Sequence, residues 1–457
     1  MDESLILAKH IADISYDDIP RSAVDVTKKS LLDGLGVITA AGTMGEGCRQ
    51  FIDLAIAGEG KKESTIIGFD ARVTASMAAF ANGSMSHALD FEDAHDKALV
   101  HPNAAAIPAA LAVAESIGNV SGKELITALT LGSDVTCRLG LALTEDPIQY
   151  GWYTPPILGA FGATAATCKL LNLSPEQILD AFSLTLCQAT CSAELTHSHR
   201  SLVRSIRDAF SAKTGVLSAQ LAERGVIGFE KPIEGEAGLF RLYARENYDL
   251  AVLTDGLGEI FEGANVSFKP WPSCRGTHYF LETTLEIVNA HDIRPADIEY
   301  IKVGIGPSPL ARTLCEPLES KQHPKTAIDA KFSIPFVVAL ASVRREVALK
   351  HFIPEAIVDP EVLEIARKVT YEVDNNLGAD EGLVELKSKQ GVFRLKTPEF
   401  AYGHPSNPIS EELLVRKFVD CAAHSAKQIS DQHLKRLVEM ILNLEDVRNI
   451  GEIMAYL

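Results

Sequence analysis

The densest group of chemically active side chains in this sequence lies between residues 87 and 102, where three histidines alternate with four acidic residues. A carboxylate beside an imidazole fixes the tautomer of the ring and moves its pKa toward neutral pH, so this combination suits proton transfer. The alternative is an acidic, solvated loop that caps the neighbouring helices. The residues concerned are His87, Asp90, Glu92, Asp93, His95, Asp96 and His101.

A metal site is the third interpretation of this segment, because Asp, Glu and His are common metal ligands. Asp90, Asp93, His95 and His101 would then be the ligands of a metal-dependent hydrolase. No His-Glu-x-x-His motif or similar ligand spacing is present. The spacing therefore predicts that no metal ion is bound.

A second group is basic, which is notable in an acidic protein. Arg204 and Arg207 follow the pair His197 and His199, and Lys213 comes shortly after them. Two arginines three residues apart near the start of a helix could face one anion, to which the first amide groups add attraction. An anionic substrate, carboxylate or phosphate, would explain this arrangement, and ordinary surface ion pairs are the alternative.

The third group runs from Lys269 to His278 and includes Cys274. It lies where a helical region should meet an α+β region, and such junctions are common positions for ligand pockets. A lysine there could hold a substrate carboxylate or stabilise an enolate, and Cys274 with His278 could form a thiolate pair. The alternative is a packed cysteine followed by a histidine that caps a helix.

Helical patterns in the N-terminal part of the chain would place the acidic segment between two rigid elements. Alanine-rich stretches over 74–88 and 104–117 flank the segment, and loops on such scaffolds often carry function. Capping boxes at Ser121 and Ser174 predict two further helix starts. The stretch Pro155–Cys168 has two glycines among several alanines, which allows neighbouring backbones to approach closely. These patterns predict a packed helical bundle.

The character of the sequence changes near residue 265. Alternation with β-branched residues predicts strands at 298–305 and 368–373, and a glycine-containing turn further on predicts a hairpin. Helical patterns at 332–340 and 360–366 lie between these strands. The pattern therefore indicates a smaller α+β domain, after which the helical pattern returns at the end of the chain.

Composition limits the classes of partner. The chain has 457 residues and a net charge of −18 at pH 7, which repels nucleic acid and anionic membrane surfaces. No apolar run approaches the roughly 20 residues of a membrane span, and the N-terminus lacks a secretory signal pattern. Eight cysteines without a C-x-x-C pair argue against disulfides and zinc. We expect a globular, cytoplasmic protein whose cysteines are mostly buried.

Several motifs, in this order along the chain, resemble those of the MmgE/PrpD family of 2-methylcitrate dehydratases, cis-aconitate decarboxylases and iminodisuccinate epimerases. The resemblance covers nearly the whole chain. The matching pieces are Asn-Gly-x-x-x-His-x-x-Asp-Phe-x-Asp at 82–93, His101-Pro102, Trp152 before Pro155 and a Gly-x-x-Gly helix, Lys-x-x-x-x-Cys-x-x-x-His at 269–278, Ala-Lys-Phe-Ser at 330–333, and Tyr402-Gly403-His404 followed by Pro408 to Phe418.

The resemblance implies a mainly α fold in which a large helical domain, made from both chain ends, carries an inserted, smaller α+β lid. The implied boundaries are 1–264 and 399–457 for the helical domain and 265–398 for the lid. Family members act as homodimers on small di- or tricarboxylates without a metal or organic cofactor. We therefore expect this protein to form a homodimer. We also expect it to bind a small anionic carboxylate as its substrate.

The resemblance also implies roles for individual residues. A base takes a proton next to a carboxylate, cationic groups hold the enolate-like charge, and a protonated residue helps hydroxide to leave. The catalytic candidates are Asp90, His101, Tyr153, Lys269 and His278. The candidates for contact with substrate are Asp93, Ala94, Arg204, Arg207 and Cys274.

These considerations favour a cofactor-independent lyase of the dehydratase type, a hydro-lyase acting on a methylcitrate-like hydroxy acid. Ala94 stands where the related decarboxylases have Thr, and Tyr153 and Cys274 stand where they have His. The first alternative is therefore an epimerase of an iminodisuccinate-like dicarboxylate, and a decarboxylase of the cis-aconitate type comes after it. A carboxylate sensor, which would bind ligand without proton exchange, is the alternative that is not an enzyme.

Overall fold

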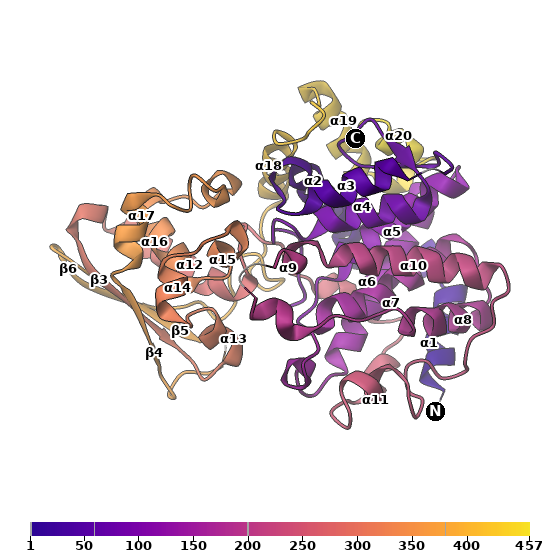
Figure 1. Cartoon of the computed structure of the whole chain (residues 1–457), viewed down its shortest axis with the longest axis horizontal. Coiled ribbons are helices and arrows are strands. Elements are labelled where there is room, and N and C mark those ends of the chain that lie inside the picture. The colour runs from indigo at the N-terminus through magenta and orange to yellow at the C-terminus, as the bar shows by residue number, and fades with distance from the viewer. Residues whose placement is uncertain (1, 59, 199–200, 380) are drawn as a thin grey trace. The chain divides into compact units, whose positions relative to one another are not determined.

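Helices make up most of the chain, as its apolar periodicity predicts, and the fold is mainly α. The computed structural model describes residues 2–58, 60–198, 201–379 and 381–457. Figure 1 shows the helices and the strands of a small sheet. No helix within these ranges combines the length and the apolar character that crossing a membrane requires.

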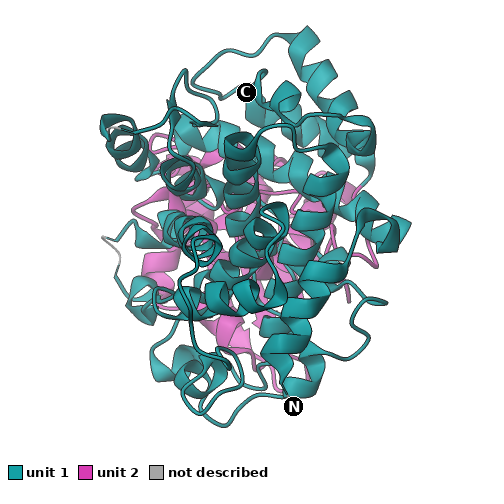
Figure 2. Ribbon diagram, turned by 90° about the vertical axis from the view of Figure 1, so that its right-hand side faces the viewer, with its two compact units in different colours: residues 1–88, 92–268, 410–457 teal, residues 89–91, 269–409 magenta. Residues whose placement is uncertain are grey.

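The chain divides into two compact units (Figure 2). Unit 1 consists of Met1–Ala88, Glu92–Phe268 and Ser410–Leu457, and unit 2 consists of Leu89–Phe91 and Lys269–Ile409. The three residues 89–91 thus belong to unit 2, although their neighbours on both sides in the sequence belong to unit 1. This short segment lies inside the acidic stretch that the sequence marks as chemically active.

Unit 1 is built from helices with one small pair of strands. Helices α4, α5, α6, α7 and α10 pack against one another and form its interior. The helices are α1 (Glu3–Asp13), α2 (Arg21–Met44), α3 (Cys48–Ala57), α4 (Ala75–Ser86), α5 (Pro102–Ile117), α6 (Gly122–Leu141), α7 (Thr154–Leu170), α8 (Pro175–Leu186), α9 (Val203–Ile206), α10 (Asp208–Glu223), α11 (Leu239–Tyr243), α18 (Glu411–Ala422), α19 (Asp431–Leu442) and α20 (Gly451–Met454).

The two capping boxes begin helices as predicted. Ser121 Oγ accepts from the main-chain N–H of Glu124 at 3.3 Å, and the Glu124 carboxylate accepts from the main-chain N–H of Ser121 at 2.7 Å. Ser174 and Gln177 repeat this arrangement at the start of α8. Each box satisfies donors that the first turn of a helix leaves without an intrahelical partner.

Two features of unit 1 differ from the predicted pattern. Strands β1 (Ser64–Thr65) and β2 (Arg72–Val73) form a short antiparallel pair in the region predicted to be helical. The helix predicted to start near Arg204 and Arg207 begins only at Asp208, and α9 precedes it as a separate turn. At the break, the Arg207 guanidinium donates to the Arg204 carbonyl at 2.6 Å, which occupies the acceptor that a continuous helix would use.

Unit 2 contains the four-stranded sheet, and its strands confirm the predicted ones. The strand order is β4-β3-β5-β6, with β3 and β4 parallel and the other pairs antiparallel. The strands are β3 (Ile298–Ile305), β4 (Val369–Val373), β5 (Gly382–Ser388) and β6 (Gly391–Lys396). The helices are α12 (Arg275–Ala290), α13 (Pro309–Thr313), α14 (Leu318–Gln322), α15 (Ala327–Lys331), α16 (Ile334–Arg344) and α17 (Pro360–Ala366).

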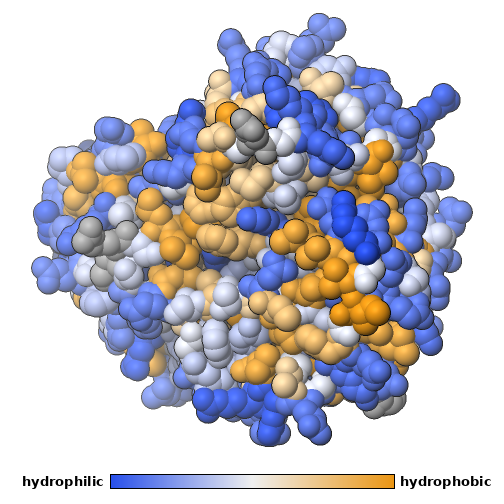
Figure 3. Space-filling model, turned by 45° about the vertical axis from the view of Figure 1, so that its right-hand side comes forward, coloured by the Kyte–Doolittle hydropathy of each residue, from blue (hydrophilic) through white to orange (hydrophobic). Residues whose placement is uncertain are grey.

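Apolar side chains also reach the surface of the protein in several places (Figure 3). On unit 1, Leu54 of α3 and Phe210 of α10 are 60% and 52% exposed. The ring of Phe210 meets those of Phe51 and Phe80 at centroid distances of 5.8 and 5.6 Å, both edge to face. Aromatic pairs favour this geometry. The contacts with Phe51 and Phe80 therefore hold the exposed ring of Phe210 in place.

The close packing of α6 against α7 depends on glycine at one position. A Cβ atom on Gly162 would overlap Thr136 Oγ1 and the Gly132 carbonyl oxygen on α6, whereas one on Gly159 would meet only Ala105 Cβ, at 3.5 Å. The two glycines lie in the same helix one turn apart, so they provide a matched comparison.

We expect Gly162→Ala to lower the free energy of unfolding by about 1–3 kcal/mol, because the added methyl group overpacks the helix contact. Gly159→Ala should leave stability unchanged or raise it by up to about 1 kcal/mol, since alanine is the better helix former. Urea unfolding followed by circular dichroism measures both. Equal effects of the two substitutions would contradict the close approach of these helices.

Candidate active site

The acidic segment connects the end of α4 to the start of α5, two helices that pack against each other. His87 is the C-terminal cap residue of α4 and His101 is the N-terminal cap residue of α5. Pro102 follows as the first residue of α5, where its missing N–H costs no hydrogen bond. The helix ends therefore bring two imidazoles that are 14 positions apart in the sequence close together, with ring centroids 4.7 Å apart.

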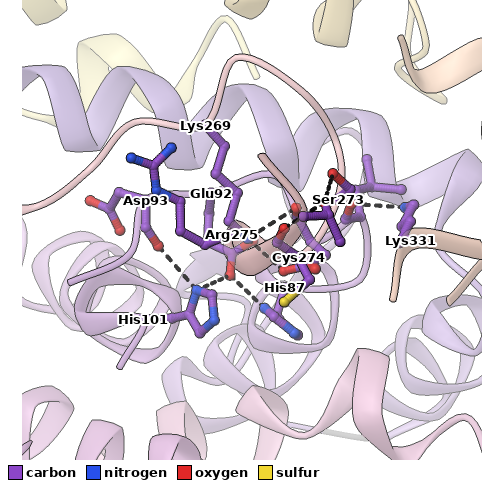
Figure 4. A network of polar contacts seen from close by, with 12 residues as sticks. His87, Glu92, Asp93, His101, Lys269, Ser273, Cys274, Arg275 and Lys331 are labelled. Carbon is purple, nitrogen blue, oxygen red and sulfur yellow. Dashed lines mark hydrogen bonds and ion pairs between the residues drawn. The ribbon is translucent and has the colours of Figure 1, made fainter. Parts of the chain in front are cut away.

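Glu92 lies between these two imidazoles and accepts from both (Figure 4). Its Oε1 atom is 2.5 Å from His87 Nδ1 and 2.8 Å from His101 Nδ1. The Nδ1 atom of His101 is also 3.1 Å from the carbonyl oxygen of Asp93. Both neighbours of this nitrogen are acceptors, so Nδ1 carries the proton of the neutral ring and Nε2 carries the lone pair.

The two histidines differ in their environment. Burial lowers the pKa of His87 to about 4, and the positive charge of Arg207 acts in the same direction. His87 is therefore neutral near pH 7 and serves as a donor to Glu92. The His101 side chain is 17% exposed, whereas that of His87 is fully buried. Of the two rings, His101 is the one with access to a ligand.

Asp93 and Ala94, the predicted substrate contacts in this segment, are both buried. The Asp93 carboxylate accepts from Asn103 Nδ2 at 2.7 Å. The backbone of Ala94 pairs with that of Ser267 in an antiparallel bridge. These contacts fix the course of the segment inside unit 1, so the geometry favours a supporting role for both residues.

Tyr153, Arg204 and Arg207 gather in one region of unit 1. Tyr153 is the N-terminal cap residue of α7, and the guanidinium carbons of Arg204 and Arg207 lie 5.8 and 5.1 Å from the centroid of its ring. These distances suit cation–π attraction. The charge of Arg207 contributes to the lowered pKa of His87, so this basic region lies within electrostatic range of the two imidazoles.

In unit 2, two buried lysines hold the segment 89–91. Lys269 Nζ donates to Asp90 Oδ1 at 2.5 Å and to the Asp90 carbonyl at 3.0 Å, and Lys331 Nζ donates to the Leu89 carbonyl at 2.8 Å (Figure 4). Asp90 has a φ of 48°, in the left-handed region that residues other than glycine rarely adopt. Such a conformation persists only when surrounding contacts enforce it, and it is common at functional sites. The structure thus brings the predicted catalytic residues Asp90 and Lys269 together.

His278 is fully buried on α12, and both of its ring nitrogens are engaged. Arg275 Nη1 is 3.3 Å from His278 Nδ1, which must accept because a guanidinium only donates. Nε2 then carries the proton and faces the Ser273 carbonyl at 3.2 Å. Burial and the charge of Arg275 keep the pKa of His278 well below its ordinary value. Both nitrogens are thus engaged within unit 2, and the roles of His278 in proton transfer and in a thiolate pair with Cys274 stay predictions.

The metal ligands considered from the sequence differ from the group that the structure assembles. His87, Glu92 and His101 each offer one ligand atom within 4.8 Å of the others. His95, by contrast, has its Nε2 atom 3.8 Å from Glu262 and receives a hydrogen bond on Nδ1 from the Ala98 main chain. The donor set of two imidazoles and one carboxylate resembles a metal site in its chemistry. Here the three groups are close enough to bond to one another directly.

Models of two domains match the chain: the MmgE/PrpD N-terminal domain over residues 6–250 and the MmgE/PrpD C-terminal domain over residues 271–443. The chain belongs to the MmgE/PrpD family. This membership confirms the resemblance drawn from the motifs.

Curated relatives of this MmgE/PrpD protein match over nearly its full length. A cis-aconitate decarboxylase-like protein, oryM, of Aspergillus oryzae is 25% identical and aligns over 98% of this chain and 96% of its own. The cis-aconitate decarboxylase of Homo sapiens is 27% identical over 93% of this chain and 88% of its own. A cis-aconitate decarboxylase of Aspergillus terreus is 22% identical and aligns over 98% of this chain and 94% of its own. These names support an enzyme that acts on carboxylates.

Sequence reasoning missed the importance of His87 and Glu92 in this MmgE/PrpD protein, although both lie in the segment that it singled out. A signal was available, because His87 and His101 each adjoin a predicted helix end and Glu92 lies between them in the sequence. Of the histidine pair noted in the sequence, His197 is exposed, and His199 lies outside the described residues. Six of the eight cysteines are buried, as predicted.

The buried Asp93 carboxyl gives the folded protein a pH dependence that can be tested. Burial raises the pKa of Asp93 from 3.8 to about 7. The hydrogen bond from Asn103 opposes this shift, and the charges of Asp33 and Glu92 add to it. The folded state therefore retains a proton that the unfolded chain releases, and this group lowers stability as the pH rises from about 4 to about 7.

We expect Asp93→Asn to remove this loss, because the amide keeps an acceptor for Asn103 but does not titrate. The free energy of unfolding of the variant, relative to wild type, should increase between pH 4 and pH 7. Urea unfolding at a series of pH values measures the difference, with Asp420→Asn on the exposed face of α18 as the control. A difference that stays constant over this range would show that Asp93 is already ionised in the folded state.

Proposed function

We propose that this protein is a lyase that transfers a proton next to a carboxylate group of a small di- or tricarboxylate, with no metal or organic cofactor. The observation that carries the proposal is the hydrogen bond that fixes Nδ1 of His101 and leaves Nε2 as a base. Family membership and the carboxylate-acting relatives support it. Dehydration of a methylcitrate-like hydroxy acid is the reaction that we place first.

In this mechanism His101 Nε2 takes the proton. Glu92 orients the ring through Nδ1 and stabilises the imidazolium that forms, which is the role a carboxylate has behind a catalytic histidine. His87 donates a second hydrogen bond to the same carboxylate oxygen and thereby holds Glu92 in place. Glu92 and His87 are accordingly positioning residues, and His101 is the catalytic residue.

Asp90 and Lys269 form the second pair that we assign to the reaction. Their buried ion pair keeps a carboxylate and an ammonium group desolvated, where each has a stronger electrostatic effect than in water. A positive charge close to the developing enolate lowers the barrier to proton abstraction. Tyr153 and Arg204 keep their predicted roles in proton transfer and carboxylate binding. For His278 we propose a positioning role instead, since it holds the Ser273 carbonyl.

Decarboxylation is the second candidate, and the names of the curated relatives favour it. Three positions argue against decarboxylation, because this chain lacks the residues that we associate with the decarboxylases there. These positions are Ala94, Tyr153 and Cys274. Both reactions pass through negative charge delocalised next to a carboxylate, so the same cations would serve either. An iminodisuccinate-like epimerase is not favoured by the relatives.

Incubation in D₂O with a panel of C4–C7 di- and tricarboxylates, followed by NMR, separates these reactions. A dehydratase gives an unsaturated product with loss of the hydroxyl group, and a decarboxylase gives a product one carbon shorter. An epimerase incorporates deuterium without a change of composition. Binding of a carboxylate without deuterium exchange or product, across the whole panel, would replace the lyase with the carboxylate sensor.

We expect His101→Ala to lower kcat/KM by about 10²-fold and Glu92→Gln to lower kcat by at least about tenfold. His433→Ala, an exposed histidine on α19, is the control. Near-wild-type kinetics in a folded His101→Ala protein would remove this residue from the mechanism.

We also expect turnover to survive EDTA treatment and dialysis unchanged. His87 and His101 both bond directly to Glu92, and this arrangement is the one that the proposed base requires. Elemental analysis of protein purified without added metal accompanies the assay. A loss of activity that one divalent ion restores would place the metal-dependent hydrolase first.

A further inference from the structure

Arg207 is a buried cation whose hydrogen-bonding capacity is only partly used. Its side chain is 1% exposed. Nη1 donates to the Arg204 carbonyl at 2.6 Å. Nε forms an ion pair with Asp208 Oδ2 at 3.6 Å, which is too long for a hydrogen bond. Among the residues that the structure describes, Nε and Nη2 have no hydrogen-bond acceptor.

Unused donors on a buried charged group are costly, and native proteins rarely leave them so without a reason. Nε and Nη2 lie on the same edge of the guanidinium plane, and their two N–H bonds point in parallel. A carboxylate matches this edge with two parallel hydrogen bonds, which makes such pairs stronger and more directional than a single contact. The open edge therefore has the geometry of a carboxylate receptor.

The surroundings of Arg207 connect this edge to the proposed base. The Tyr153 ring lies 5.1 Å from its guanidinium carbon and covers part of the charge without using a donor. The positive charge of Arg207 contributes to the lowered pKa of His87, and the negative charge of Glu92 contributes to the raised pKa of Arg207. A carboxylate bound at this edge would therefore lie in the electrostatic neighbourhood of His101.

We propose that the Nε–Nη2 edge of Arg207 is a subsite that binds one carboxylate of a small di- or tricarboxylate through two hydrogen bonds. The proposal rests on the proposed lyase function and adds the group that anchors its substrate. Arg207 is the primary anchor because its donors are desolvated and open in advance, so little ordering is needed on binding. Arg204 lies on α9, with its guanidinium carbon 5.8 Å from the centroid of the Tyr153 ring, and adds attraction as a secondary contact.

Isothermal titration calorimetry with propane-1,2,3-tricarboxylate tests this subsite without turnover, because the probe has neither a hydroxyl group nor a double bond. We expect Arg207→Lys to weaken binding about tenfold, because the fork geometry is lost while the charge remains. Arg207→Met should weaken it about a hundredfold, since both hydrogen bonds and the charge are lost. Arg224→Gln, at the exposed end of α10, is the matched control and should bind as wild type does.

Methionine fills a similar volume, and replacing a buried charge by an apolar side chain is often tolerated. Thermal unfolding of each variant without and with the probe checks the fold. The expected pattern is a folded Arg207→Met protein whose unfolding temperature no longer rises with the probe. Wild-type affinity in both Arg207 variants, or an equal loss in Arg224→Gln, would overturn the subsite.

The two proposals fail in different ways. Turnover that persists with unchanged KM in Arg207→Lys and Arg207→Met would remove the subsite and leave the lyase intact. Arg207-dependent binding of the probe in a protein that converts no member of the carboxylate panel would remove the lyase and leave the subsite intact.

Discussion

The proposed chemistry depends on one buried carboxylate that two imidazoles share. Glu92 is almost fully buried, and a charged group in that position is tolerated only when donors surround it. The Nδ1 atoms of His87 and His101 are such donors. In satisfying Glu92 they fix both tautomers, and the tautomer of His101 decides that its other nitrogen is a base. The need to satisfy one buried charge thus selects the reactive atom.

This arrangement in turn requires the ends of α4 and α5 to be held close together. The two helices pack against each other and against α10, and α5 also packs against α7, so the positions of the cap residues His87 and His101 are set by a rigid interior. The residues between them take an unusual course, with Asp90 in the left-handed region of backbone conformation. Lys269 and Lys331, both buried, bond to the segment 89–91 from within unit 2. The strain at Asp90 is therefore maintained by contacts that the rest of that unit supplies.

The sequence predicted those parts of the fold that short-range chemistry decides. The boxes Ser121–Glu124 and Ser174–Gln177 each act within four consecutive residues, and both begin helices where expected. The strand at 298–305 follows from its alternation and is present with the same bounds. The break at Arg207 was not predictable in this way, because it depends on a side chain that bonds to a carbonyl three residues earlier in place of a helix hydrogen bond.

The candidate site shows the same division between local and tertiary information. Motif and residue type selected Asp90, His101, Lys269 and Arg207 as candidates, but which groups bond to one another follows from the folded chain. His278 illustrates the limit, because its type suits proton transfer while its position between Arg275 and the Ser273 carbonyl engages both nitrogens. The homodimer and the cytoplasmic location stay predictions from the sequence.

The charge of the protein bears on the proposed function, because an anionic substrate of the proposed lyase would have to be recognised by buried cations. With a net charge of −18 the chain repels a tricarboxylate at long range, but physiological salt screens that repulsion beyond roughly 8 Å. Attraction must therefore arise at short range, from groups whose effect is not weakened by water. Arg207 in unit 1 and Lys269 in unit 2 are both nearly inaccessible to solvent. Because desolvation strengthens each interaction that they make with an anion, a few such residues suffice to outweigh the excess of surface carboxylates.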